Sequence, residues 1–458
     1  MALRLFSSRS RRVPRLLAAS ATALAVALVA AGCSSGGSGS SSDSAFGFKT
    51  ADQKKNSTIE VWVDTARQPA ADAFKKAHPE IPIKVTTYDG NANGSGTFQT
   101  KISLFDQSGS GWPDVVWSTQ QNDAAWASQE TGGQQAFAAP LNKGYFDKKF
   151  LDGFAKGALD PATIKGTVYG ARNDLAQNVL WYDQKLFDQF GYKVPTTWEE
   201  YQALGEKVAK EHPGYIVGSV GDPWAPEVYF WGAKAPLTDV KGIDTISVNT
   251  KDAHTVKMAK LLDDLVSAGS IVQDSVFGAS FHDFSGKVLM MPGPSWYSGA
   301  IFQNKDALNA PAGEIGAGLP LAWKGEDPAT GNVGGGIWYV SSHSANLAAA
   351  KTFVQFVSSS DQYQVDLAPG YPAYSSAAAK WLDKQAASGY FVGDFKQNLI
   401  TAAGQVWNGW GFPRFSQEAV WAKAITPQLA KGSKLVDLLP SWQTAIENEA
   451  KVNGYTVK

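Results

Sequence analysis

Short apolar runs and amphipathic stretches alternate along the first part of this chain. "TIEVWV" (58–63) and "IPIKVTTYD" (81–89) are rich in β-branched residues, which is typical of strands. Between them, "QPAADAFKKAHPE" (68–80) has the spacing of a helix that ends near Pro79. "PDVVWST" (113–119) repeats the pattern of a buried strand before another helical segment. This alternation predicts βαβ units around a parallel sheet, and therefore an α/β fold.

Three later segments have the amphipathic pattern of helices. They are "TTWEEYQALGEKVAKEH" (196–212), which begins with a threonine, "AAAKTFVQFVSSS" (348–360) and "PSWQTAIENEAKVN" (440–453). The stretch "VLMMPGPSWYSGA" (288–300) has a different pattern, with a buried apolar strand followed by prolines and then by two aromatic rings. We expect the prolines to end the strand and Ser295 to cap a following helix, which leaves the rings at an edge.

The first 32 residues have the pattern of a bacterial export signal. Five arginines precede the apolar run "LLAASATALAVALVAA", which is shorter and richer in alanine than a membrane span of roughly 20 apolar residues. The tetrad "AAGC" (30–33) resembles the bacterial lipoprotein box, in which the cysteine carries a lipid and becomes the new N-terminus. The resemblance implies that Cys33 anchors the protein to a membrane. The alternative is an ordinary cleavage site with a chance cysteine.

Residues 33–56 are predicted to form a flexible Ser/Gly tether. "SSGGSGSSSDS" has almost no apolar side chain to bury, so it cannot offset the entropy lost on ordering. Cys33 is the only cysteine of the chain. Disulfides and cysteine-based metal sites are therefore excluded.

Length and charge limit the possible classes of protein. Residues 33–458 exceed the usual size of one hydrophobic core, which predicts two domains. The whole chain has a formal net charge of −1, and the first 32 residues contain five arginines and no acid, so the remainder carries −6. A mildly acidic protein without a basic run does not have the composition of a nucleic-acid-binding protein.

The chain lacks the common catalytic signatures. Apart from "GCSSG" (32–36), which lies in the lipoprotein box and the Ser/Gly run, there is no G-x-S-x-G, and there is no H-E-x-x-H, no Walker loop and no G-x-G-x-x-G. The five histidines are scattered without metal-ligand spacing. We therefore expect no catalytic residue, no metal and no cofactor, although a pair of glycosidase-like carboxylates is defined in space rather than by spacing and stays open.

Five blocks of sequence carry a family resemblance that covers nearly all of the chain after residue 56. They are "VWVDTARQPAADAFKKAHPEIPIKV", "GWPDVVWSTQQNDAAW", "GTVYGARNDLAQNVLWYDQKLFDQFGYKVPTTWEEYQAL", "FSGKVLMMPGPSWYSGA" and "GGGIWYVSSHSANLAAAKTFVQFVSSSDQYQ". In this order they resemble the family 1 extracellular solute-binding proteins. These are the sugar-capturing components of ABC importers and are similar to the maltose-binding proteins.

The resemblance implies a two-lobe periplasmic-binding-protein-like α/β fold, with a hinge of crossing strands and the ligand held in the cleft between the lobes. Carried onto this chain, the first lobe comprises residues 57–172 and 312–358. The second lobe comprises 173–311 and 359–458. The first crossing falls within "VYGARNDLAQNVLWYD" (168–183). Clefts between domains are preferred ligand sites, which agrees with this implication.

Trp296 and Tyr297 are the first candidates for ligand binding. In the family, a Gly-Pro-Trp at this place supplies a stacking platform for a sugar ring. This chain has Ser295 inserted before Trp296, so either ring is a candidate. A pyranose has C–H faces that an aromatic ring desolvates and edge hydroxyls that need hydrogen-bond partners, so aromatic rings beside polar groups suit a sugar.

The other candidate ligand-binding residues lie after predicted strands, at the crossing and toward the C-terminus. They are Asp64 and Arg67, Gln120, Gln121 and Asp123, Asp174 and Asn178, Asp222 and Trp224, and Trp338, Trp410 and Arg414. The resemblance implies that the acid and the ring of "GDPWAPE" contact ligand and that the crossing residues face the cleft. Residues after "PDVVWS" are candidates because strand ends open onto the cleft in α/β folds. Each candidate has a structural alternative: a turn, a hinge contact, the start of a helix or core packing.

The predicted function is that of a sugar-binding component of an ABC importer rather than an enzyme. Its ligand is expected to be an oligosaccharide, and its partners are the membrane subunits of the permease and the membrane that holds the lipid on Cys33. We expect a monomer on the outer face of the cytoplasmic membrane. Two alternatives stay open: the same fold with a polyol or glycerol phosphate as ligand, and a secreted carbohydrate-active enzyme.

Overall fold

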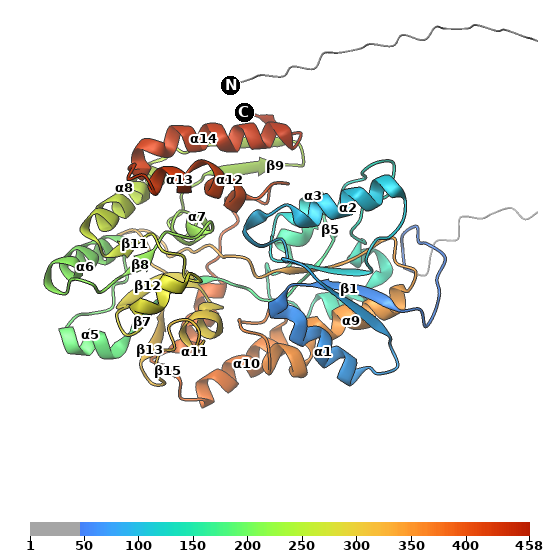
Figure 1. The fold of residues 1–458 in the computed structure, drawn as a ribbon, viewed down its shortest axis with the longest axis horizontal. Coiled ribbons are helices and arrows are strands. Elements are labelled where there is room, and N and C mark those ends of the chain that lie inside the picture. Colours follow the sequence, from blue (N-terminus) through green and yellow to red (C-terminus); the bar gives the residue numbers. More distant parts are fainter. Residues whose placement is uncertain (1–45) are drawn as a thin grey trace, which may run out of the picture. The chain divides into compact units, whose positions relative to one another are not determined.

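A computed structural model describes residues 46–458. The predicted export signal and Cys33 lie outside the described residues. The described chain contains two main sheets, each covered by helices on both faces (Figure 1). We call the elements packed around the first sheet the first lobe and those around the second sheet the second lobe.

The first sheet has the strand order β2-β1-β3-β14-β6. Its strands are β1 (Ile59–Val63), β2 (Ile83–Thr87), β3 (Val115–Ser118), β6 (Ala171–Arg172) and β14 (Ile337–Val340). β1 is parallel to both β2 and β3, as the βαβ pattern predicts, and β14 is antiparallel to β3 and β6. β14 returns from a distant part of the sequence, and this makes the sheet mixed rather than parallel throughout.

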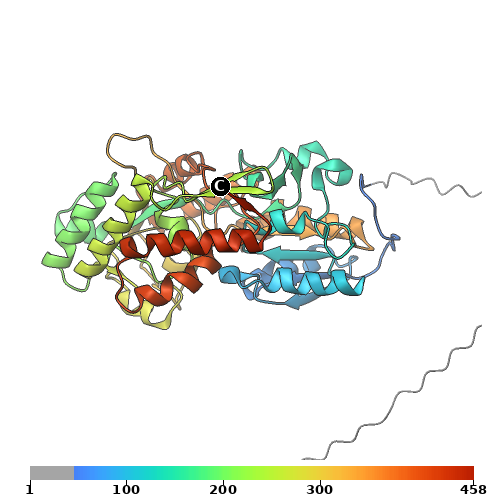
Figure 2. The same cartoon turned by 90° about the horizontal axis from the view of Figure 1, so that it is seen from above.

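Side chains alternate between the two faces of the sheet along each strand, and both faces carry apolar side chains that need to be buried. Helices therefore cover both faces. Val61 packs against α1 (Gln68–Ala77) and α9 (Leu347–Ser359) in one hydrophobic cluster. Trp62, next along the strand, packs against α2 (Thr97–Ser108) and α3 (Asp123–Ala127) in another. In both views, α9 lies beside elements from the start of the described chain (Figure 2).

The second sheet has the order β12-β7-β13-β15. Its strands are β7 (Asn178–Asp183), β12 (Met290–Pro294), β13 (Ile315–Gly318) and β15 (Phe391–Val392). Both β12 and β13 are antiparallel to β7. β13 therefore belongs to this sheet, although the sequence analysis placed residues from 312 onward in the first lobe. A four-residue strand carries no sequence signal for which sheet it joins.

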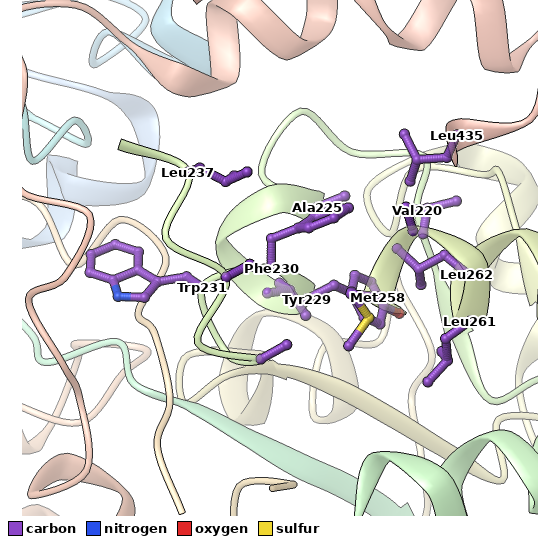
Figure 3. Packing of buried hydrophobic residues seen from close by; sticks show 14 of the residues in the cluster. Val220, Ala225, Tyr229, Phe230, Trp231, Leu237, Met258, Leu261, Leu262 and Leu435 are labelled. Atoms are coloured by element: carbon purple, nitrogen blue, oxygen red, sulfur yellow. The ribbon is translucent and has the colours of Figure 1, made fainter. Parts of the chain in front are cut away.

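Two clusters of apolar side chains cover the faces of the second sheet. One contains Trp181 with residues of α10 (Ser375–Ala387) and α11 (Phe395–Ala403). The larger one joins the neighbouring Leu180 to side chains from six further helices. Tyr229, Phe230, Met258 and Leu262 belong to it (Figure 3). These helices are α5 (Gln184–Phe190), α6 (Trp198–Glu211), α7 (Ala225–Tyr229), α8 (Ala253–Ala268), α12 (Gln417–Ala424) and α14 (Leu435–Val452).

Shorter elements complete the described chain. The strands are β4 (Thr163–Ile164), β5 (Thr167–Val168), β8 (Gly218–Ser219), β9 (Thr238–Lys241), β10 (Thr245–Val248), β11 (Ile271–Val272) and β16 (Thr456–Val457). The helices are α4 (Lys148–Leu151) and α13 (Thr426–Leu429). The 3₁₀ turns are η1 (Thr65–Arg67), η2 (Ala92–Gly94), η4 (Asp160–Ala162) and η5 (Ala279–Phe284). The π-helical turns are η3 (Leu141–Tyr145), η6 (Ser298–Phe302) and η7 (Asp361–Val365). Over residues 46–458, no helix is both long and apolar enough to cross a membrane.

The predicted helices are present, with one early start. α6 begins as expected, because Thr197 and Glu200 form a reciprocal capping box. α14 begins at Leu435, five residues before the predicted segment. The carboxylate of Asp263 accepts the backbone N–H groups of Leu435 and Val436, at 2.6 and 3.0 Å. This cap satisfies the first turn, and the helix continues through Pro440.

Strand β12 continues through Pro292 but ends at Pro294, within the stretch where the sequence predicts its end. Pro292 and Pro294 pair with Leu180 and Asn178 of β7. β12 is an edge strand of its sheet, where a missing backbone N–H is tolerated. Ser295 does not cap a helix, contrary to the expectation from sequence, since its hydroxyl has no partner among the described residues and the next helical turn begins at Ser298.

The C-terminal part of the predicted tether packs against the first lobe. The ring of Phe46 lies 5.7 Å from that of Tyr145. The side chain of Gln53 donates to the carbonyl of Ser344 at 3.0 Å and accepts from the backbone N–H of Leu347 at 3.0 Å. The free tether therefore stays a prediction only for residues 33–45, which lie outside the described residues.

Three chain segments cross between the lobes side by side. The middle one, 173–177, hydrogen bonds on one side to 331–336, where the N–H of Asp174 donates to Gly335 at 3.0 Å. On its other side it bonds to 371–373, where the N–H of Leu175 donates to Tyr371 at 2.9 Å. The predicted first crossing (168–183) contains this middle segment. The lobes are thus joined by a narrow hydrogen-bonded strip.

The second crossing is possible only with glycine. Gly334, Gly335 and Gly336 all have φ between 51° and 84°, a region that side chains disfavour. A Cβ on Gly336 would lie 1.7 Å from the ring of Trp117, and one on Gly335 would lie 2.5 Å from the guanidinium of Arg172. The glycines therefore allow the strip to pass directly against the first sheet.

A buried arginine holds the crossing segments together. The guanidinium of Arg172 donates to the carbonyls of Asp174 and Gly334, both at 2.9 Å, and to the side chain of Gln121 at 2.8 Å. Burial lowers the pKa of Arg172 to about 10, an effect that the nearby carboxylate of Asp174 opposes. Arg172 thus remains charged at neutral pH.

We predict that Arg172→Met lowers the free energy of unfolding by about 3–5 kcal/mol, because the substitution leaves several carbonyls without their donor and removes a positive charge near the buried carboxylate of Asp174. Urea denaturation measures this change. Lys207→Met, which removes an exposed cation 3.8 Å from Glu211, is the control and should cost less than about 1 kcal/mol. A loss for Arg172→Met as small as that of the control would contradict the role given to this residue.

Candidate functional site

A cavity of about 490 Å³ lies between the two lobes, at the hinge. The first lobe lines it with Asp64, Arg67, Asn93, Thr119 and Gln120, the second with Trp224, Phe277, Trp296, Asn304 and Glu418, and the crossing segment with Val333, Gly334 and Gly335. The first-lobe residues follow the carboxyl ends of β1, β2 and β3. These strand ends are the usual binding edge of a parallel sheet.

The first-lobe wall of the cavity is polar. Asp64 accepts from the backbone N–H of Arg67 at 2.8 Å, which caps the η1 turn. It also accepts from the guanidinium of Arg67 at 3.1 Å, so the two opposite charges compensate each other. The guanidinium also lies over the ring of Trp117, 4.3 Å from its centroid. The buried Nε of Arg67 has no acceptor among the described residues. Arg67 therefore keeps one hydrogen-bond donor unused beside the cavity.

The second-lobe wall is aromatic. The rings of Phe277 and Trp296 are parallel within 9°, with centroids 5.9 Å apart. The ring of Trp224 meets both edge-on, at 5.9 Å from Phe277 and 6.1 Å from Trp296. The indole N–H of Trp296 donates to the hinge carbonyl of Val333 at 2.9 Å, which fixes this ring. These three rings form an apolar platform opposite the polar wall, and we call them the aromatic platform.

Of the two rings proposed from "PSWYS", Trp296 lines the cavity and Tyr297 does not. Tyr297 is buried behind the platform, where its hydroxyl accepts from the indole N–H of Trp224 at 3.3 Å. Burial raises the pKa of Tyr297 well above its ordinary value, so the hydroxyl stays protonated. Tyr297 supports the platform rather than forming it.

Gln120 links the two lobes directly. Its amide N–H donates to the carboxylate of Glu418 at 2.8 Å, and its amide oxygen accepts from the hydroxyl of Ser416 at 2.9 Å. Burial raises the pKa of Glu418 to about 7, and the charge of Asp222 adds to the effect. One end of the cavity is therefore closed by a hydrogen-bonded contact that contains an ionisable group.

Five more predicted residues are close to the cavity without lining it. Asp222 accepts from Ser275 and from the backbone of Val276, at 2.5 and 3.0 Å, and so holds the loop that carries Phe277. The other four are Gln121, Asp123, Asp174 and Asn178. Gln121 accepts from Arg172 and donates to Asn332, and Asp123 accepts from Asn91 and Ser118. Asp174 lies within the hinge, and Asn178 donates to the carbonyl of Glu227. These polar groups are engaged in structural contacts, except Oδ1 of Asn178, which has no hydrogen-bond partner among the described residues.

Three predicted residues lie elsewhere. Trp338 is fully buried in the first-lobe core, and its indole donates to Asn173. Trp410 is buried in the second lobe, stacked on Trp231 at 5.2 Å, and it borders a small hollow next to the cavity. Arg414 donates to the carbonyl of Asn453 and to Asp244, and it borders a different hollow of about 510 Å³. Both tryptophan rings are packed in a hydrophobic core, which is the structural alternative that the sequence analysis gave for them.

The sequence analysis missed two important residues of the cavity. Phe277 has 57% of its surface exposed, and the only signal for it is a large aromatic residue beside Gly278 in a polar loop. Glu418 lies in the first turn of α12, where an acidic residue has the ordinary interpretation of stabilising a helix start. Its burial depends on Gln120, almost 300 residues earlier, so no local pattern identifies it.

Comparisons with known proteins agree with this geometry. The family described as bacterial extracellular solute-binding protein matches residues 59–364. The multiple sugar-binding protein of Streptococcus mutans is 24% identical over 321 residues, which cover 65% of this chain and 69% of that protein. A putative binding protein of Brucella abortus is 28% identical over 198 residues, or 40% of this chain and 47% of that protein.

Solved structures with the same fold are two-lobe binding proteins. An ABC transporter associated binding protein of B. animalis subsp. lactis, in complex with β-1,6-galactobiose, has a TM-score of 0.71 at 21% identity and covers 88% of this chain and 99% of that one. The galacto-N-biose/lacto-N-biose I-binding protein of Bifidobacterium longum has a TM-score of 0.70 at 20% identity, covering 89% and 100%. The predicted α/β fold with two lobes and a cleft between them is confirmed.

We predict that Glu418→Gln flattens the pH dependence of stability. In the unfolded chain this carboxyl loses its proton near pH 4.5, but in the folded protein it keeps the proton up to about pH 7. Between these pH values the folded state binds more protons, so this group lowers the free energy of unfolding by about 1.4 kcal/mol per pH unit as the pH rises. Urea unfolding near pH 5 and pH 7 compares the wild type with the variant. Glu206→Gln, on the exposed face of α6, is the control, and a Glu418→Gln profile parallel to that of the wild type would contradict the prediction.

Proposed function

The chain belongs to the bacterial extracellular solute-binding proteins, and we propose that it captures a sugar in the cavity between its lobes and delivers it to the membrane subunits of an ABC importer. The observation that carries this proposal is the aromatic platform of Trp224, Phe277 and Trp296 facing a polar wall. The cavity of about 490 Å³ lies within the range of about 300–1,000 Å³ that is typical of small-molecule sites.

The two walls match the two kinds of surface on a sugar. An aromatic ring desolvates the C–H face of a pyranose. Asp64, Asn93 and Gln120 on the opposite wall offer acceptors and donors for the hydroxyls along its edge. The proteins named above support a sugar over other solutes, since one is called a multiple sugar-binding protein and two were solved with disaccharides. An oligosaccharide is our proposed ligand.

Binding is proposed to favour the closed arrangement of the lobes. Only a closed protein contacts the ligand with both walls, so ligand binding shifts the population toward that form. The narrow strip of crossing segments accommodates such a motion through a few backbone dihedrals. The membrane subunits would then recognise the closed form.

We predict that Trp296→Ala weakens sugar binding about 30-fold, or about 2 kcal/mol, because a cavity-lining aromatic residue contributes this much when it anchors a ligand. Titration calorimetry with a panel of oligosaccharides, including β-1,6-galactobiose and lacto-N-biose, finds the ligand and measures the loss. Urea denaturation of the same variant should show little change.

Trp112→Ala is the matched control for this experiment. Trp112 is also a half-buried tryptophan, stacked on His343 at 3.8 Å, but it precedes β3 and so lies at the end of the strand opposite to the cavity. Its affinity should equal that of the wild type. Equal affinities for both variants would refute the platform, and release of sugar cleavage products during the titration would favour an enzyme instead.

We also propose that a lipid on Cys33 holds the protein at the outer face of the cytoplasmic membrane. The support is the sequence alone, because Cys33 lies outside the described residues. Each buried methylene of a lipid chain adds about 0.8 kcal/mol of membrane affinity. Cys33→Ala should therefore move the protein from the membrane fraction to the soluble fraction when cells are fractionated. A variant that still needs detergent for extraction would show that the anchor lies elsewhere.

A further inference from the structure

A small hollow of about 40 Å³ opens beside the sugar cavity. The two spaces share Thr119, Gln120, Gly334 and Glu418 in their walls, so they adjoin each other at the Gln120–Glu418 contact. The hollow is further lined by Glu227 of α7 and Gln417 of α12. A buried water needs about 10–15 Å³, so this hollow has room for one small charged group. We call it the acidic hollow.

The polar groups of the acidic hollow are buried and incompletely paired. Glu227, Gln417 and Glu418 are only 8%, 9% and 7% exposed. Within residues 46–458, Oε2 of Glu227 and both amide atoms of Gln417 have no hydrogen-bond partner. Such groups normally find a partner, because a buried polar atom without one costs free energy. They therefore point to a missing ligand.

The acidic hollow also lacks a positive charge. Neither Glu227 nor Glu418 forms an ion pair with any described residue, and Glu418 accepts only from the neutral amide of Gln120. The other charged groups that act on Glu418 are the carboxylates of Asp222 and Asp123. Burial and the charge of Glu418 together raise the pKa of Glu227 well above its ordinary value. The two carboxyls therefore tend to keep their protons, and a cation in the hollow would favour their ionised forms and pair with them.

The carboxylates are held in place by rigid neighbours. Glu227 lies on α7, whose Tyr229 is packed in the second-lobe core together with Phe230 (Figure 3). Glu418 lies on α12, whose Trp421 packs against Trp442 of α14 with ring centroids 4.9 Å apart. Neither helix can withdraw its carboxylate into solvent without breaking this core. The site is thus preformed.

We infer that the sugar bound by this protein carries a protonated amine, which enters the acidic hollow and pairs with Glu227 and Glu418. This inference rests on the proposed function and narrows its ligand to the amino sugars. An ammonium group has three N–H donors, and the hollow offers three acceptor groups: the two carboxylates and the amide oxygen of Gln417. A hydroxyl at the same place would bring one donor and no charge.

The test compares two sugars with the same backbone. Oligomers of β-1,4-linked glucosamine and of β-1,4-linked glucose, two to four units long, differ only by an ammonium or a hydroxyl on each ring. By titration calorimetry, we expect wild-type protein to bind the glucosamine oligomers at least about tenfold more tightly. Glu418→Gln and Glu227→Gln should each reduce this ratio to about threefold or less. Glu206→Gln makes the same change of charge on an exposed helix face and should leave the ratio unchanged.

A second measurement does not depend on the backbone of the sugar. Methylammonium chloride should raise the melting temperature of the wild type above its value in sodium chloride of equal concentration, because a ligand stabilises the folded state that binds it. The increase should disappear in Glu418→Gln and Glu227→Gln. The described residues contain no group of three or more His, Cys, Asp or Glu that is placed to hold a metal ion. Calcium chloride is nevertheless included as a competing cation.

The outcomes separate this inference from the proposed function. Two outcomes overturn the inference of an amine but leave the proposed sugar-binding function standing. One is equal binding of both oligomers. The other is binding of the neutral oligosaccharides named above without any effect of methylammonium. A methylammonium effect without binding of any sugar supports the acidic hollow and contradicts the proposed function. Stabilisation by calcium alone, lost in both glutamine variants, would assign the hollow to a metal ion and overturn the inference. No response to any amine overturns it as well.

Discussion

One buried cation determines how the two lobes meet. The guanidinium of Arg172 satisfies the carbonyls of Asp174 and Gly334, which lie on two different crossing segments, and the side chain of Gln121 after β3. A planar group with five donors in fixed directions imposes an orientation on each of these acceptors. The positions of Gln120 and of the glycine segment follow from it, and both line the cavity. The shape of the site is therefore set from within the hinge.

The two lobes contribute different physical properties to the cavity. The first lobe supplies polar groups at the carboxyl ends of its strands, while the second supplies the aromatic platform. The platform is held from behind by buried groups, with Tyr297 accepting from Trp224 and Asp222 binding the loop of Phe277. The contact between Gln120 and Glu418 is the place where these two walls touch directly.

Sequence patterns predicted the fold better than the site, for a physical reason. The first three strands and α6 appear where periodicity and capping place them, because these signals act within a few residues. Trp296 was identifiable because a break in the chain precedes it. Glu418 was not, since its burial results from a contact with Gln120 far away in the sequence. Trp338 and Trp410 show the converse difficulty: nothing local distinguishes a tryptophan of the core from one that lines a cavity.

The glycine segment and the loop of Phe277 differ in how much change they tolerate. A side chain at Gly335 or Gly336 would collide with Arg172 or Trp117 and would also strain the backbone. Phe277, by contrast, is more than half exposed on a loop at the mouth of the cavity. Over evolution, the hinge therefore tolerates few substitutions, whereas the loop of Phe277 tolerates more. A descendant of this protein would change its ligand by altering that loop, with no change to the residues on which folding depends.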